Sequence, residues 1–282
     1  MYPARRMSVV CLLCLSLAAV LCLPLSGVAQ DTPWHDAALE AMVRAALDQP
    51  IGEIASERLA VVTSLSLYGD TLLLADAPPP DTYRMGQVSD LRDLAKFPHI
   101  STLTLWHQSA ADLQPLASLT GLTALSLAEL PVTDLSPLAG LIGLTSLTVR
   151  GTQVSDLSPL AGLTGLTTLA LWNNAIVDLS PLAGLTRLQA LLLWRNRIES
   201  VEALAPLAQL TRLDLYGNSI SSIEPLAGLV RLTWLSLDEN PIEDPAPLAG
   251  LKKLRTLYIT YRPPTVTEKV LKRMLPNCYI SQ

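Results

Sequence analysis

Aliphatic residues recur along most of the chain with a period of 22 residues. The first position of this period is Ile100 and then a leucine in each of seven further units, with no insertion or deletion. Within a unit, an aliphatic residue returns three and five positions later, as at Leu166, Leu169 and Leu171. A fixed period of this length is typical of a solenoid built from repeated structural units.

Each unit predicts a short strand followed by a return that contains no long helix. The Leu-x-Leu alternation around position 5 predicts a strand with one buried face. In the seven units from residue 100 to residue 253, position 16 is proline except at Ala203, and position 17 is always leucine. Proline prevents a long α-helix, so we expect a short 3-10 or extended return with its leucines facing inward. A single unit cannot bury these leucines, whereas stacked units can.

Polar residues recur at two turn positions of the unit. Asparagine at position 9 predicts a ladder of buried amides that satisfies backbone groups between successive units. Aspartate at position 13 is interpreted as a turn-capping residue, since a catalytic carboxylate would have no reason to repeat. The asparagines are Asn174, Asn196, Asn218 and Asn240, the earlier units have Gln108, Leu130 and Thr152 instead, and the aspartates are Asp112, Asp134, Asp156, Asp178 and Asp244. We expect the early turns to be less regular.

The unit resembles the 22-residue leucine-rich repeat of bacterial internalin-like proteins and of phosphatase-regulatory repeat proteins. Residues 166–185 read LTTLALWNNAIVDLSPLAGL, and the array spans residues 100–262. The resemblance implies an α/β solenoid shaped like a horseshoe, with a parallel β-sheet on the concave face and short 3-10 or extended returns on the convex face. It also implies that the protein binds other macromolecules.

Both ends of the array have helical segments that we interpret as caps, because an uncovered solenoid end would be an open sheet edge. Residues 30–61 form the expected N-terminal cap, with Leu39, Met42, Val43, Ala46 and Leu47 on one helical face. Its helix would begin at Thr32-Pro33 or at Asp36 and end at Pro50 or Gly52. Residues 263–282 form the expected C-terminal cap, with a capping box from Thr265 to Glu268, a stop at Pro276 and a last short strand that contains Cys278.

Residues 62–99 are interpreted as a degenerate first repeat. About 16 extra residues interrupt it, and we place them in an inserted loop at 68–87. The run Leu72-Leu73-Leu74 argues against full exposure, so we expect the loop to fold back on the cap.

Residues 1–29 are interpreted as a signal peptide with cleavage before Gln30, which predicts an exported protein, periplasmic or secreted. The alternative is an anchor that is kept, since the apolar run is long for a signal. No other stretch is long and apolar enough to span a membrane. Removing the leader lowers the 20 basic residues to 18 against 25 acidic ones, a formal charge of −7, and leaves Cys278 as the single cysteine. We expect a monomer.

Composition and motifs argue against catalysis and against nucleic-acid binding. The acidic excess leaves no basic surface for nucleic acid. No nucleophile elbow, zinc-binding helix motif, P-loop or dinucleotide fingerprint is present, and the three histidines are scattered. We therefore expect no enzyme, no metal and no cofactor.

The concave face is where we expect binding, because positions 3, 5 and 7 alternate with the core leucines. Trp172, Trp194 and Tyr216 fall on adjacent strands and should form a contiguous stripe, while Trp106 and Trp234 have no aromatic partner in this scheme. Tryptophan, tyrosine and arginine are enriched at binding hot spots. The candidate partner-binding residues are Trp106, Arg150, Trp172, Leu192, Trp194, Arg195, Arg212, Asp214, Tyr216, Trp234, Asp238 and Tyr258.

Three interpretations of this face remain open. The first is an unidentified protein partner, bound with the aromatic stripe for affinity and the charged residues for orientation. The second is a carbohydrate-binding module that stacks sugar rings on the same aromatics. The third is purely structural, because neighbouring aromatic pairs stabilise a sheet by roughly 0.5–1.5 kcal/mol each.

Overall fold

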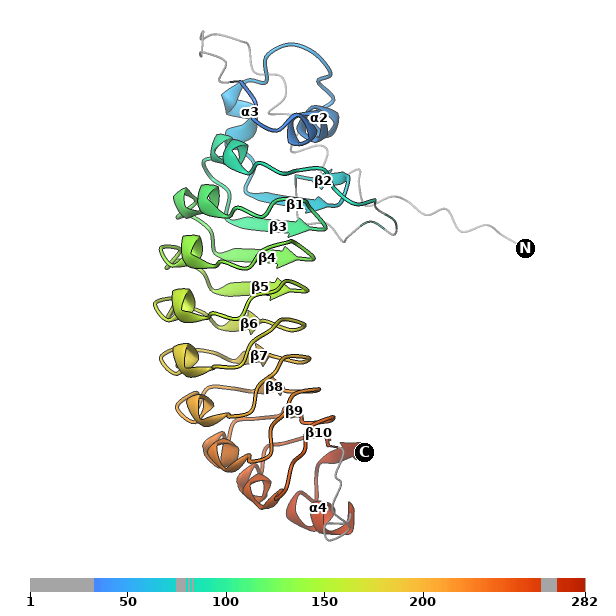
Figure 1. The fold of residues 1–282 in the computed structure, drawn as a ribbon, viewed down its shortest axis with the longest axis vertical. Helices are drawn as coiled ribbons and strands as arrows, with labels where there is room; N and C mark the ends of the chain where they lie inside the picture. The colour runs from blue at the N-terminus through green and yellow to red at the C-terminus, as the bar shows by residue number, and fades with distance from the viewer. Residues whose placement is uncertain (1–32, 75–79, 81, 83, 260–267, 282) are drawn as a thin grey trace, which may run out of the picture.

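The computed structural model describes residues 33–74, 80, 82, 84–259 and 268–281; the expected signal peptide lies outside these residues. In this part of the chain the strands form one open sheet of 11 strands, ordered β11-β10-β9-β8-β7-β6-β5-β4-β3-β1-β2 (Figure 1). Only the β1–β2 pair is antiparallel within it. The strands are β1 (Ser64–Tyr68), β2 (Thr71–Leu73), β3 (Thr102–Trp106), β4 (Ala124–Ala128), β5 (Ser146–Arg150), β6 (Thr168–Ala170), β7 (Ala190–Leu192), β8 (Arg212–Asp214), β9 (Trp234–Ser236), β10 (Thr256–Tyr258) and β11 (Tyr279–Ser281).

The sheet keeps the register that the 22-residue period predicts. Leu103 of β3 lies opposite Leu125 of β4, which lies opposite Leu147 of β5, and the same pairing continues to Leu257 of β10. These leucines are fully or almost fully buried. A uniform register therefore places every core position on one side of the sheet and every intervening position on the other.

The returns are short 3-10 helices, as the proline at position 16 predicts. Most of them have proline in their first turn and bury the leucine that follows, as with Pro159 and Leu160. They line the convex side of a bowed stack, opposite the strands (Figure 1). The helices are η1 (Arg92–Lys96), η2 (Gln114–Ser118), η3 (Ser136–Leu138), η4 (Ser158–Leu160), η5 (Ser180–Leu182), η6 (Glu202–Leu204), η7 (Glu224–Gly228) and η8 (Ala246–Gly250).

The polar turn residues have the predicted structural roles. The Asn196 amide donates to the carbonyls of Leu171 and Leu193, both at 2.9 Å, and its oxygen accepts from the Ile176 N–H. The position-13 aspartates accept from the backbone two residues on, as Asp156 does from Ser158 at 2.8 Å. Both sets of residues are therefore confirmed as backbone caps.

Gln108, which stands where later repeats have asparagine, also caps backbone groups, although the sequence predicted a less regular turn there. Its side chain is fully buried, and its amide donates to the carbonyls of Gly69 and Trp106 at 2.7 and 3.1 Å. Its oxygen accepts from the Val88 N–H at 3.3 Å. The longer glutamine side chain thus connects the first full repeat to both ends of the inserted segment.

The N-terminal end is covered by helices α2 (Ala37–Ala46) and α3 (Ser56–Ala60). Asp36 is the N-cap of α2, one of the two predicted starts, and accepts from the Leu39 N–H. The predicted end at Pro50 or Gly52 is wrong, because the helix ends at Ala46 and Asp48 already has a positive φ of 51°. A left-handed residue terminates a helix before any downstream proline can.

The inserted segment begins with a strand instead of a loop. Residues Thr71–Leu73 form β2, which pairs with β1 and lies at the edge of the sheet. Leu72 is buried, and β2 packs against α2, so the expectation that this segment folds back on the cap is confirmed there. The exposed edge left by β1 is therefore covered by the chain's own insertion.

The C-terminal end contains α4 (Glu268–Met274) followed by β11, which pairs with β10. Leu271 and Leu275 are buried against the array, whereas Thr265 of the predicted capping box lies outside the described residues. Cys278 directly precedes β11 instead of lying within it. Its burial raises the pKa of the thiol to about 11, which keeps it protonated and unreactive.

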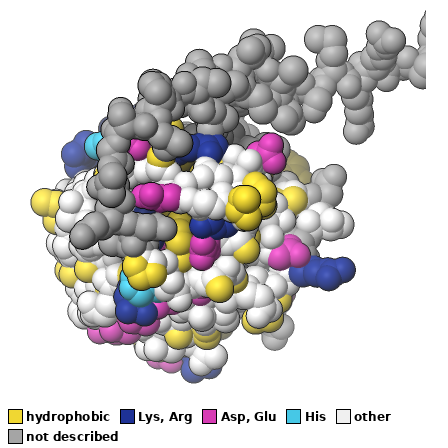
Figure 2. All heavy atoms as spheres, turned by 90° about the horizontal axis from the view of Figure 1, so that it is seen from above, with side chains coloured by type: hydrophobic (Ala, Val, Ile, Leu, Met, Phe, Trp, Pro, Cys, Tyr) yellow, Lys and Arg dark blue, Asp and Glu magenta, His cyan; other side chains and the backbone are white. Residues whose placement is uncertain are grey.

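The described residues contain no helix that is long and apolar enough to cross a membrane. Seen from the N-terminal end, the surface mixes basic, acidic and hydrophobic side chains without a broad region of one charge (Figure 2).

Candidate functional site

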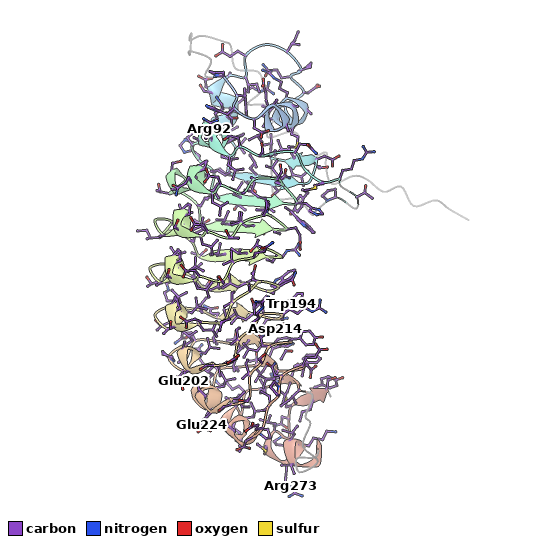
Figure 3. All side chains as sticks on the ribbon, viewed as in Figure 1. Arg92, Trp194, Glu202, Asp214, Glu224 and Arg273 are labelled. Atoms are coloured by element: carbon purple, nitrogen blue, oxygen red, sulfur yellow. The ribbon has the colours of Figure 1, made fainter. Side chains whose placement is uncertain are left out.

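The outer sheet face is the face opposite the leucine core, formed by the side chains at positions 3, 5 and 7 of the repeats. The alternating burial along β3 and β5 shows this arrangement directly. Figure 3 shows Trp194 and Asp214 on the strand side, away from Glu202 and Glu224 on the side of the 3-10 helices. Every one of the twelve candidate residues lies on this face or at the turn that borders it, and all are half-buried except the exposed Arg195 and Arg212.

Four of the candidates form a continuous stack along position 7. The guanidinium carbon of Arg150 lies 4.5 Å from the ring centroid of Trp106 and 4.5 Å from that of Trp172. Trp172 in turn stacks on Trp194, with ring centroids 4.3 Å apart and planes inclined by 13°. Tyr68 of β1 extends the row by an edge contact with Trp106 at 5.5 Å. We call Trp106, Arg150, Trp172 and Trp194 the stacked row.

Ala128 makes this stack possible. It occupies position 7 on β4, between Trp106 and Arg150, and only 1% of its surface is exposed. Parallel strands lie about 4.8 Å apart, so side chains two strands apart meet only above a small residue. Alanine therefore lets the guanidinium reach across to Trp106.

The structure corrects the expectation that Trp106 and Trp234 are unpaired. Trp106 contacts Arg150 and Tyr68, as described above. Trp234 has the guanidinium carbon of Arg212 4.1 Å from its ring centroid and contacts Tyr258 with centroids 5.6 Å apart. Both tryptophans therefore have intramolecular partners, including in each case an arginine whose contact with the ring the sequence pattern did not predict.

The stacking does not continue to Tyr216, although Tyr216 is the next residue of the row. Its hydroxyl group hydrogen bonds with Glu239 and with Arg195, and the hydrogen bond to Glu239 raises the pKa of Tyr216. The guanidinium carbon of Arg195 also lies 5.7 Å from the ring centroid of Trp194. A polar cluster thus adjoins the last ring of the stacked row.

Asp214 lies between the stacked row and the Trp234 pair. Its burial raises the pKa of the carboxyl group, and the N–H of Tyr216, at 3.2 Å, partly offsets this effect. Arg212, two residues before it on β8, favours the charged form. The second half of the face therefore combines charges of both signs with aromatic rings.

Position 8 forms a row of left-handed turn residues of which only Arg195 was among the candidates named from the sequence. Each residue there has a positive φ of 54–64°, in the left-handed region that favours glycine, yet only two of the seven are glycine. For six of the seven, the left-handed turn directs the N–H to a carbonyl of the next repeat, as from Arg195 to Tyr216. The glycines at this position were the available signal. The residues are His107, Glu129, Gly151, Asn173, Arg195, Gly217 and Glu239.

The described residues include no group of three or more histidine, cysteine, aspartate or glutamate side chains arranged to hold a metal ion. The position-13 aspartates are occupied by backbone and serine donors in turns, and Asp178 accepts from both the N–H and the hydroxyl of Ser180.

Comparison with known proteins identifies relatives by sequence and by structure. A family model described as leucine rich repeat matches residues 186–242. No curated protein matches the chain. The structure is similar to internalin C2 (inlC2) from Listeria monocytogenes, with 33% identity, a TM-score of 0.73, and coverage of 84% of this chain and 100% of that one.

Two further solved structures are more distant. An internalin (inlF) from Listeria monocytogenes is 25% identical with a TM-score of 0.53, covering 87% of this chain and 88% of that one. The LRR ectodomain of the plant membrane receptor kinase GASSHO1/SCHENGEN3 from Arabidopsis thaliana is 23% identical with a TM-score of 0.56, covering 64% of this chain and 24% of that one. The plant receptor shows a likeness of fold alone.

Proposed function

The chain belongs to the family of internalin-like leucine-rich repeat proteins. We propose that it is an exported, non-enzymatic protein that binds another protein through the outer sheet face, which is the concave side of the solenoid. The leucine-rich repeat fold suggests interaction with another protein. The plant receptor ectodomain of the same fold was solved in complex with CASPARIAN STRIP INTEGRITY FACTOR 2. The observation that supports the proposal most is the stacked row on the outer sheet face.

The stacked row has the properties of a binding hot spot. Tryptophan and arginine are the residues whose truncation most often costs a complex more than about 2 kcal/mol. Trp172 is held between Arg150 and Trp194, so its side chain is already ordered before a partner arrives. Ordered side chains lose little conformational entropy on binding, which favours affinity.

The covered ring faces favour a protein partner over a glycan. A sugar stacks on a free aromatic face, whereas Trp172 has Arg150 over its ring on the β5 side and Trp194 on the β7 side. Such rings offer their edges and the indole N–H group, which suit the carbonyl and carboxylate oxygens of a polypeptide. We therefore rank the carbohydrate-binding alternative second.

The test compares capture of polypeptides by wild type and by the combined variant Trp172→Ala, Trp194→Ala, Tyr216→Ala. The bait is protein recovered after export, whose intact mass also reports whether residues 1–29 are removed. We expect a specific polypeptide to be captured by wild type and its affinity to fall at least about tenfold in the variant, since 1.4 kcal/mol already corresponds to a factor of ten.

The matched control removes three exposed apolar side chains from elsewhere on the repeats, Ile142→Ala, Val177→Ala and Val230→Ala. This variant should capture the same polypeptide as wild type. The proposal fails if the aromatic variant binds as tightly as wild type, or if the control loses the partner equally. Thermal unfolding of all three proteins separates lost binding from lost folding.

A further inference from the structure

We propose that Arg150 is a preformed receptor for a carboxylate group of the bound protein, so that the first half of the outer sheet face takes an acidic segment. This inference rests on the proposed function and specifies the chemistry of the partner. It starts from the position of the arginine between Trp106 and Trp172.

The two rings hold the guanidinium group of Arg150 between them. Its carbon lies 4.5 Å from the centroid of each ring, so the group contacts an aromatic side chain on two sides. The N–H donors of a guanidinium lie at the rim of its plane, in a fork that matches a carboxylate with two parallel hydrogen bonds. A guanidinium group held between two rings can still offer these donors to a partner.

The fork of Arg150 is not used by the chain itself. Within the described residues, Arg150 has no side-chain hydrogen bond and no ion pair. The neighbouring acidic residue is Glu129. One of its carboxylate oxygens lies 2.3 Å from the point where a Cβ on residue 151 would be if that residue were not glycine. The glutamate therefore packs over the glycine backbone, and the absence of a side chain at Gly151 is what gives it room.

The surroundings of Arg150 favour an anion over a cation. Of the twelve residues at positions 3, 5 and 7 on β3 to β6, Arg150 is the only charged one. The edges of the neighbouring tryptophan rings are the positive parts of their quadrupoles. The remaining positions are mostly small and hydroxylic, such as Thr104, Ser126 and Thr148, which can hydrogen bond with an extended backbone.

The whole chain has a formal charge of −5, which repels acidic partners at long range. Arg150 must therefore recognise a carboxylate at short range, through the geometry of its hydrogen bonds, and not through the net charge of the protein. This predicts that replacing the guanidinium group with the ammonium group of lysine, which keeps the charge, is enough to weaken binding of an acidic peptide.

The probe is a fluorescent peptide of five Gly-Glu repeats, with five Gly-Gln repeats as the uncharged counterpart, titrated against the exported protein at low ionic strength. Tryptophan fluorescence and peptide anisotropy report binding. We expect the Gly-Glu peptide to bind at least about tenfold more tightly than the Gly-Gln peptide, and Arg150→Lys to remove that difference because lysine has no fork.

Two further variants make the test specific. Ala128→Leu leaves every charge in place but inserts a side chain between Arg150 and Trp106, so it should weaken Gly-Glu binding as Arg150→Lys does. Arg187→Lys, at an exposed arginine near the start of β7, is the control and should bind as wild type does. If Ala128→Leu does not fold, Arg150→Lys alone decides.

The proposal is overturned if Arg150→Lys binds the Gly-Glu peptide as tightly as wild type, or if the two peptides bind equally. These outcomes are distinguishable from failure of the proposed function. A polypeptide that is captured through Trp172, Trp194 and Tyr216 but is indifferent to Arg150→Lys would leave protein binding in place and remove the carboxylate receptor.

Discussion

At the scale of single residues, the repeats depend on asparagine amides at the turns, buried or half-buried, that replace missing backbone partners. Asn174 donates to the carbonyls of Val149 and Leu171 at 2.8 and 2.9 Å, and its oxygen accepts from the hydroxyl group of Thr152 at 2.6 Å. A side chain that satisfies several buried groups is costly to remove, because each group left without a partner costs about 1–3 kcal/mol. The adjacent Asn173 is exposed and makes no such bridge within the described residues.

The two neighbouring asparagines provide a matched test. We expect Asn174→Ala to lower the free energy of unfolding by about 1–3 kcal/mol, since the carbonyls of Val149 and Leu171 lose their donor. Asn173→Gly should be neutral or slightly stabilising, because φ is 56° there and glycine adopts that conformation without strain. Urea unfolding followed by circular dichroism measures both. Equal losses in the two variants would contradict the ladder's role.

At the scale of elements, two buried carboxylates join the N-terminal cap to the first return. Asp36 accepts from the N–H groups of Ser89 and Asp90 at 2.8 and 3.0 Å, besides capping α2. Asp93, which is 1% exposed, accepts from the N–H groups of His35 and Asp36 at 2.7 and 2.9 Å. The cap is thus attached by reciprocal hydrogen bonds as well as by apolar contacts.

This attachment predicts a loss of stability in acid. Burial raises the pKa of Asp36, but the backbone hydrogen bonds from Ser89, Leu39 and Asp90 outweigh it and lower the net value below 3.8. A lowered folded pKa means that the charged form stabilises the fold above pH 3.8 and that this contribution is lost as the pH falls through the lowered value.

Asp36→Asn should therefore be less stable than wild type near neutral pH, and the difference should shrink as the pH falls below the normal aspartate range. Unfolding midpoints in urea at near-neutral and strongly acidic pH measure this. Asp134→Asn is the comparison: hydrogen bonds from Ser136 lower the pKa of this carboxyl group too, but the turn is exposed, so its pH-dependent loss should be smaller than that of Asp36→Asn. A difference between Asp36→Asn and wild type that is constant with pH would contradict the electrostatic origin.

At the scale of the whole molecule, the array is an open sheet whose two ends need covering. The N-terminal end has β2 and α2, and the C-terminal end has α4 and β11 (Figure 1). Units of a solenoid contact mainly their neighbours, so an uncovered end exposes both apolar surface and unpaired backbone groups. The caps therefore cover the surfaces through which the two ends of the array would otherwise associate.

We expect wild type to be a monomer and Val43→Asp to self-associate. Val43 is fully buried on α2, and an aspartate there would separate the helix from the leucines it covers. Light scattering during size-exclusion chromatography gives the mass of each species. Ala41→Asp, at an exposed position of the same helix, adds the same single charge and is the control. A monomeric Val43→Asp variant would show that α2 is not needed to protect this end.

The repeat, the register of the sheet and the turn residues could be predicted because each depends on local pattern. Leu103, Leu125 and Leu147 share a face since strand side chains alternate with period two, and an unbroken 22-residue spacing brings like positions into register. The capping roles of Asp156 and Asn196 could be predicted in the same way, because their hydrogen-bond partners stand at a constant number of residues along the sequence in each repeat.

What the sequence alone determined was which residues lie on which face of the solenoid. Only the tertiary structure decided how those residues meet: Arg150 reaches Trp106 over Ala128, Trp234 pairs with Arg212, and Tyr216 turns to polar partners. The physical reason is that contacts across strands depend on the size of the side chain between them and on where each flexible arginine finds its lowest free energy. The period of the repeat specifies neither the size of the intervening side chain nor the conformation of the arginine.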